Sequence, residues 1–209
     1  MSLEPHEDGP AVRVDPQAAP WVRWGLLFYG LMAVVAIVWR EGFYGESIFL
    51  AASSDGGAVG HLSAAGIGVL AGLVVVLLSH WMTRLTRWGE ELARVLAETL
   101  GFLSVPNALL LALASGLAEE MFFRGALQPR VGLGVASVLF GAMHFVPRRE
   151  FLPWTGFAVA CGLLFGALFD WTGSLAAPVA AHVVVNGINL PLLARRTSDG
   201  SADPVEPNL

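Results

Sequence analysis

The sequence predicts an all-α fold, a polytopic bundle of about six transmembrane helices with one amphipathic helix at the membrane interface. Of its 209 residues, 55% are hydrophobic and 14% are charged, whereas a typical soluble domain has about 25% charged residues. The apolar residues fall in runs that approach the roughly 20 residues a helix needs to cross a bilayer core. All seven tryptophans lie at or near the ends of these runs or on the amphipathic stretch, as in the aromatic belts of membrane proteins.

Two spans precede the amphipathic stretch. The first covers residues 21–39, with Arg23 near enough to its start to reach the interface. The second covers residues 63–82, after a loop that contains glycine and serine. Over residues 84–103, apolar residues recur at helical spacing, and arginines and glutamates alternate at i,i+4 separations on the other face. This pattern predicts a helix on the membrane surface, with a solvated face above a lipid-facing stripe.

Four spans follow the amphipathic stretch. Pro106 suits the first turn of a helix, and Pro129 marks the next boundary. The polar stretch from Pro147 to Glu150 and the sequence after Phe169 separate the remaining runs. The predicted spans are residues 106–128, 131–145, 153–169 and 175–193.

Six spans place both termini on the same side of the membrane. With the termini in the cytoplasm, nine arginines lie inside and only Arg40 and Arg130 lie outside, which satisfies the positive-inside rule. The expected location is the bacterial inner (cytoplasmic) membrane, with the lipid bilayer as a partner. The modest net charge of −5 gives no indication of nucleic-acid binding.

Few strongly polar side chains lie within the spans. Charged groups there are costly and usually face a protein interior or a water-filled cavity, so they are functional candidates. Glu120 and Arg124 share a helix face at i,i+4 and predict a structural ion pair. Glu119 is turned by about 100° and is expected to face histidines of other spans. The polar set is Glu119, Glu120, Arg124, His144, His182, Asn186 and Asn189.

Three of these groups are expected at similar depths. At 1.5 Å per residue, Glu119, His144 and His182 lie roughly 13, 20 and 12 Å below the outer surface. A carboxylate in an apolar site suits general-base catalysis on water, and an adjacent imidazole can share the proton. His182 with Asn186 can stabilise an oxyanion. The set therefore predicts peptide hydrolysis.

Other interpretations of the same residues stay open. Glu119, His144 and His182 could bind a divalent metal such as zinc, although the H-E-x-x-H signature is absent and no cofactor is expected to be required. A serine nucleophile is less favoured, because Ser115 lies in a weak sequence context. Each group alone could be structural, for example as hydrogen bonds between helices. Their joint occurrence in so apolar a chain favours a site.

Three motifs in this order resemble those of the CPBP family, the CAAX-protease and bacteriocin-processing (Abi) family of intramembrane endopeptidases, in particular the Ras-converting-enzyme type. They are Glu119-Glu120-x-x-x-Arg124, Phe140-x-x-x-His144 and His182-x-x-x-Asn186. The resemblance implies that Glu119 and His144 activate water and that His182 and Asn186 stabilise the oxyanion. It assigns supporting roles to Glu120, Arg124 and Phe140.

The resemblance covers residues 106–193, which are expected to form a catalytic core of four spans. The other parts are a disordered tail over 1–19, two spans and the amphipathic helix over 20–105, and a polar tail over 194–209. The implied partner is a membrane-anchored or C-terminally tagged protein substrate, and the small size also fits a myxosortase-like member. The alternatives are a non-catalytic immunity or scaffold protein of the same fold, and a transporter or proton relay.

Overall fold

The computed structural model describes residues 18–51, 58–101 and 103–200, and within these ranges it is helical without strands. One isolated β-bridge joins Leu50 and Ser174. The all-α prediction is confirmed. Most of the tail expected over 1–19 lies outside the described residues. The elements are α1 (Ala18–Ile37), η1 (Val38–Phe43), α2 (Ala58–Leu85), α3 (Arg87–Leu100), α4 (Val105–Glu120), η2 (Met121–Leu127), α5 (Gln128–Met143), η3 (Arg149–Phe151), α6 (Leu152–Thr172) and α7 (Ala176–Gly200).

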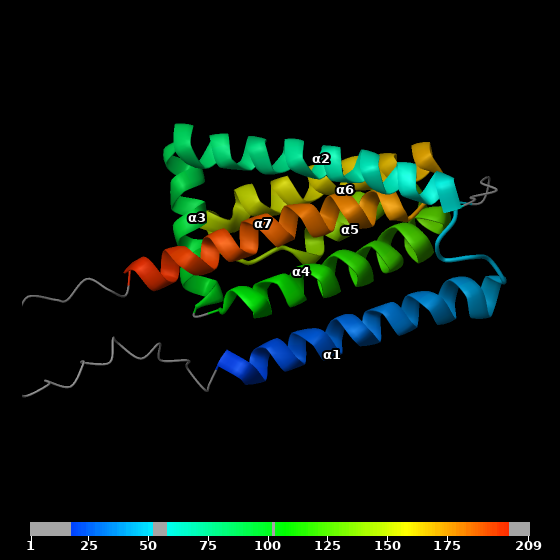
Figure 1. The fold of residues 1–209 in the computed structure, drawn as a ribbon, viewed down its shortest axis with the longest axis horizontal. Coiled ribbons are helices and arrows are strands. Elements are labelled where there is room, and N and C mark those ends of the chain that lie inside the picture. The colour runs from blue at the N-terminus through cyan, green and yellow to red at the C-terminus, as the bar shows by residue number, and fades with distance from the viewer. Residues whose placement is uncertain (1–17, 52–57, 102, 201–209) are drawn as a thin grey trace, which may run out of the picture.

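Five helical stretches of the described chain are long and apolar enough to cross a membrane, and the protein is an integral membrane protein. One of them, Val105–Met143, has 39 residues, about 58 Å of helix, or twice a bilayer core. It contains both α4 and α5, which lie as separate rods (Figure 1). The helix is broken at Gly132, whose φ of 81° suits glycine. This stretch therefore supplies two of the six predicted crossings.

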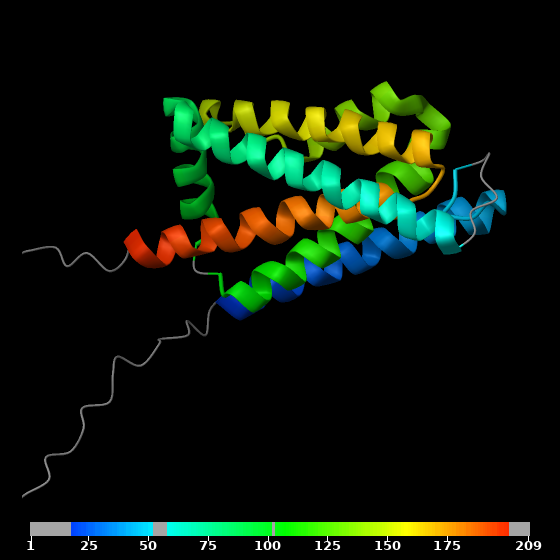
Figure 2. The ribbon, with the colours of Figure 1, turned by 45° about the horizontal axis from the view of Figure 1, so that its top comes forward.

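Helix α3 lies across one end of the bundle, at the end where α1 begins and α7 finishes (Figures 1 and 2). Thr86 caps it by accepting a hydrogen bond from the Gly89 N–H. Its buried face packs against α2 and α7. The prediction of a lipid-facing stripe is therefore wrong in part: Leu92 and Leu96 line a cavity inside the protein, because the helix folds back onto the bundle end. Helix α7 continues past 193 to Gly200.

At the opposite end, charged side chains from η1 and α5 meet. Arg40 is buried, and Arg40 and Arg130 each lie 2.7 Å from the same Glu46 carboxylate oxygen. The Arg130 guanidinium also lies 3.6 Å from the centre of the Tyr44 ring, a cation–π contact. The two arginines that the sequence placed outside thus share one acid at the end away from α3.

Helices α2 and α7 approach each other so closely that glycine is required between them. A Cβ at Gly68 would lie 2.0 Å from the Ala177 carbonyl oxygen, and one at Gly72 would lie 2.7 Å from that of Ala181. Small residues at such contacts let membrane helices pack backbone to backbone. This packing sets the position of α7, which holds His182 and Asn186.

We expect Gly68→Ala to lower the free energy of unfolding by about 1–3 kcal/mol, the usual effect of overpacking. Gly66→Ala is the matched control, since a Cβ at Gly66 meets nothing within 4 Å. Thermal unfolding of both variants in detergent is the measurement. Equal midpoints for the two variants would show that the α2–α7 contact is not tight.

Candidate active site

The charged motif lies where α4 passes into the π-helical segment η2. The last α-helical residues of α4 are Glu119 and Glu120, and Arg124 lies within η2. A π-helical turn adds a residue to the turn and redirects the side chains that follow, and such turns are frequent at functional sites. The three residues are 7%, 0% and 1% exposed, so all three charges lie inside the protein.

The ion pair predicted between Glu120 and Arg124 is present. Arg124 Nη1 donates to Glu120 Oε1 at 3.1 Å, and Arg124 Nε lies 3.1 Å from Oε2. Arg124 Nη2 donates to the Gly162 carbonyl at 3.1 Å. The guanidinium also lies 4.4 Å from the centre of the Phe140 ring, a cation–π distance. The buried cation is thus held by α4, α5 and α6 together.

His182 contacts Glu120 and not Glu119, so the prediction that it faces Glu119 is wrong. His182 Nδ1 lies 2.7 Å from Glu120 Oε1. A carboxylate has more acceptor sites than one arginine fills, and His182 occupies one of them. The close contact of α7 with α4, where a Cβ at Gly116 would lie 2.7 Å from Val183, brings His182 to that side. Because an ionised carboxylate only accepts, Nδ1 of His182 bears the proton.

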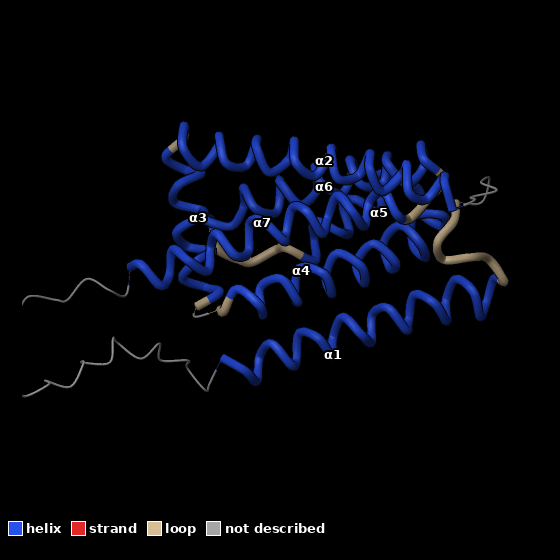
Figure 3. The backbone as a smooth tube through the Cα atoms, viewed as in Figure 1, coloured by secondary structure: helices blue, strands red, loops and turns tan. Residues whose placement is uncertain are grey.

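His144 is the partner of Glu119. Helix α5 ends at Met143, and His144 is its C-cap residue, in the loop that leads to α6 (Figure 3). His144 Nδ1 lies 2.8 Å from the Phe140 carbonyl oxygen, which can only accept, so Nε2 is left as an acceptor. That Nε2 lies 3.9 Å from Glu119 Oε2, too far for a hydrogen bond. Glu119 Oε2 has no hydrogen-bond partner among the described residues.

Asn186 is held by a serine that the sequence analysis treated as a weak feature. Asn186 Nδ2 donates to Ser115 Oγ at 3.0 Å, and Ser115 is buried in α4. Ser115 lies one helical turn before Glu119, and this i,i+4 spacing could have identified it. The serine therefore acts as a support for Asn186.

Phe140 and Gln128 complete the supporting structure. Phe140 is buried, and its ring centroid lies 4.7 Å from that of His144 and 5.9 Å from that of His182. Gln128 Nε2 donates to the Gly166 carbonyl at 3.1 Å and to Asp170 at 2.8 Å. The packing position predicted for Phe140 is observed, whereas Gln128 was not foreseen.

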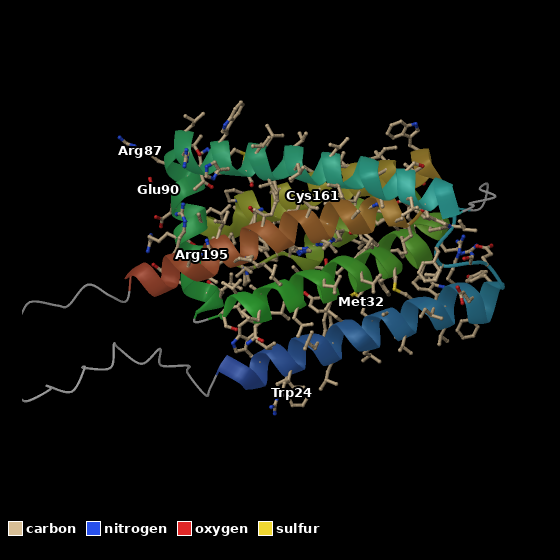
Figure 4. The ribbon with its side chains drawn as sticks, viewed as in Figure 1. Trp24, Met32, Arg87, Glu90, Cys161 and Arg195 are labelled. Atoms are coloured by element: carbon tan, nitrogen blue, oxygen red, sulfur yellow. The ribbon has the colours of Figure 1, made fainter. Side chains whose placement is uncertain are left out.

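A cavity of about 190 Å³ lies beside these groups, toward the α3 end of the bundle. His144, His182 and Asn186 line it, together with Asn189 and the free thiol of Cys161. Figure 4 shows Cys161 between the helices of the bundle. Among the described residues, neither glutamate forms part of its wall. The histidines and the amide are thus the groups that meet a molecule in the cavity, with one acid behind each histidine.

The acids and histidines form two separate pairs. Glu119 lies near His144, and Glu120 near His182. Within the described ranges, no three His, Cys, Asp or Glu side chains are grouped closely enough to hold a metal ion. The possible metal set of Glu119, His144 and His182 is therefore not gathered at one point.

Residues 101–188 match the family model described as Rce1-like, Type II CAAX prenyl endopeptidase Rce1-like. The matched segment contains all three motifs. Residues 101–188 form an Rce1-like domain. The family resemblance is thereby confirmed. The Rce1-like segment runs from α4 into α7, and α1, α2 and α3 lie outside it.

The chain is also similar to the Bacillus subtilis (strain 168) protein named "Uncharacterized protein YpbD". The two are 39% identical over 87 residues, which is 41% of this chain and 44% of that protein. The match therefore spans less than half the length of the relative. No solved structure matches the chain.

Proposed function

We propose that the protein is an intramembrane endopeptidase that hydrolyses a peptide bond of a membrane-anchored or C-terminally tagged protein. The supporting observation is the pair of acceptors formed by Glu119 Oε2 and His144 Nε2, which lie 3.9 Å apart. His144 lines the same cavity as His182 and Asn186, and Glu119 lies behind His144. The Rce1-like segment contains all four residues.

Two acceptors at this separation suit one water molecule. A water oxygen about 2.8 Å from each atom can donate one hydrogen to each, which directs an oxygen lone pair at a substrate carbonyl carbon. As the C–O bond forms, the released proton moves to Glu119 or His144. When the C–N bond breaks, the same proton passes to the leaving amine.

We propose that His182 and Asn186 stabilise the oxyanion. Asn186 uses Nδ2 to hold Ser115, and its second N–H is available to the substrate oxygen. His182 donates from Nε2 when its ring is protonated, and the Glu120 carboxylate at Nδ1 compensates that charge. Glu120 therefore orients His182 in addition to pairing with Arg124.

We propose that no metal ion is required. Glu119, His144 and His182, the residues that could have bound zinc, are not gathered at one point in the part of the chain that the structure describes, so no step of the mechanism uses a metal. The sensitivity of cleavage to a chelator tests this proposal.

We further propose that the protein lies in a bacterial inner membrane with both termini in the cytoplasm. The distribution of arginines supports this orientation. Residues of α3 line the cavity, and α3 lies at the end of the bundle where α1 begins and α7 finishes (Figure 1). A substrate would then reach the site from the cytoplasmic side.

The test uses the purified full chain in liposomes. The probes are internally quenched peptides with a C-terminal CAAX sequence, either farnesylated or unmodified, and a lipid-anchored protein with a tagged C-terminus. We expect the wild type to cleave at one bond, which mass spectrometry identifies. We expect His144→Ala to lose this cleavage and 1,10-phenanthroline to leave it unchanged. Cleavage that the chelator abolishes would contradict the metal-free mechanism. Cleavage that His144→Ala leaves unchanged, or no cleavage of any probe by the wild type, would contradict the proposed function and favour a scaffold or immunity protein.

A further inference from the structure

Helix α1 lies outside the Rce1-like segment but runs beside α4 (Figures 1 and 2). The two helices are parallel and in a fixed register. Val22 shares a buried cluster with Ala108, and a Cβ at Gly25 would lie 3.3 Å from Leu111. One turn further along α1 comes Tyr29, level with the part of α4 that leads to the charged motif.

Tyr29 is the polar side chain that α1 directs at the site. It is half-buried and packs against the α1–α4 cluster. In the register set by Val22 and Gly25, Tyr29 is level with Ser115, which lies one turn before Glu119 on α4. A buried tyrosine hydroxyl normally finds a hydrogen-bond partner, and an ionised carboxylate is a strong acceptor.

We propose that Tyr29 is a positioning residue for Glu119, donating its hydroxyl hydrogen to the carboxylate and holding it toward His144. Tyr29 approaches Glu119 from α1, and His144 approaches it from the end of α5. Ser115 lies between the two halves of the site, since it also accepts from Asn186. A helix outside the Rce1-like segment thus completes the site, which explains why α1 packs along α4.

The first test is kinetic and rests on the proposed function. Tyr29→Phe removes only the hydroxyl and is expected to lower kcat about tenfold, the usual range for one hydrogen bond to a charged group, with KM unchanged. The farnesylated and unmodified quenched peptides are the substrates. Tyr44→Phe is the matched control, because Tyr44 contacts Arg130 at the other end of the bundle, and it should leave kcat unchanged. An unchanged kcat in Tyr29→Phe, or a rise in KM alone, would overturn the proposal.

A second test does not depend on turnover. Thermal unfolding is compared for Tyr29→Phe alone and combined with Glu119→Gln or Glu120→Gln. A hydrogen bond to the carboxylate predicts that Tyr29→Phe lowers Tm by about 3 °C in the wild-type background. In the Glu119→Gln background the decrease should be half that or less, because a neutral acceptor binds more weakly. In the Glu120→Gln background the full decrease should persist, since Glu120 contacts Arg124 and His182. Equal effects in all three backgrounds would overturn the inference even if the protein cleaves no peptide.

Discussion

Glu119→Gln is expected to lower kcat about 1,000-fold or more, because the amide cannot accept the proton that the attacking water must lose. The substitution nearly preserves the size of the side chain, so insertion and folding should be unchanged. The measurement is turnover of a quenched peptide by the protein in liposomes, at equal amounts of folded enzyme.

Glu150→Gln is the matched control for this variant. Glu150 lies in the short helix η3 and pairs with Arg148 at an exposed position, so its replacement should leave kcat unchanged. A Glu119→Gln variant with near wild-type turnover would remove the basis for assigning Glu119 as the general base.

Arg124→Met is expected to have the largest effect on stability. Removing one partner of a buried ion pair leaves the other charge uncompensated and costs about 3–5 kcal/mol. Here the remaining group would be Glu120, which is fully buried and also holds His182. Resistance to unfolding in mixed micelles of mild and denaturing detergent would report the loss.

A double variant separates loss of charge pairing from loss of packing. Glu120→Gln with Arg124→Met removes both charges, and we expect it to regain much of the lost stability. Arg94→Met on the exposed face of α3, where Arg94 pairs with Glu91 and Glu98, should leave the unfolding midpoint unchanged. Equal resistance of Arg124→Met and the wild type would show that the buried pair contributes little.

The sequence was sufficient for features that depend on neighbours along the chain. The spans follow from local apolar runs, and the broken helix at Gly132 leaves room for the predicted number of crossings. The Glu120–Arg124 pair follows from i,i+4 spacing on one helix. Such contacts form whenever the helix forms, so periodicity predicts them.

The features that sequence reasoning missed depend on how helices face one another. The partner of His182 is set by the contact between α7 and Gly116 of α4. Depth in the membrane alone does not distinguish Glu119 from Glu120 as that partner. Gln128 bonds to residues of α6, and Tyr29 of α1 packs against residues of α4. Residue spacing within one helix carries no information on how a distant helix is rotated about its own axis. That rotation decides which side chains of the two helices contact each other.

The central claim, that Glu119 and His144 activate one water molecule, is tested most directly by a kinetic double-mutant cycle. The values of kcat for Glu119→Gln, His144→Ala and the double variant are compared in liposomes with one quenched peptide. If both side chains act on the same water, the double variant should be about as slow as the slower single variant, because groups that act as a unit give non-additive losses. Losses that multiply in the double variant would show that the two residues act independently and would contradict the shared-water mechanism.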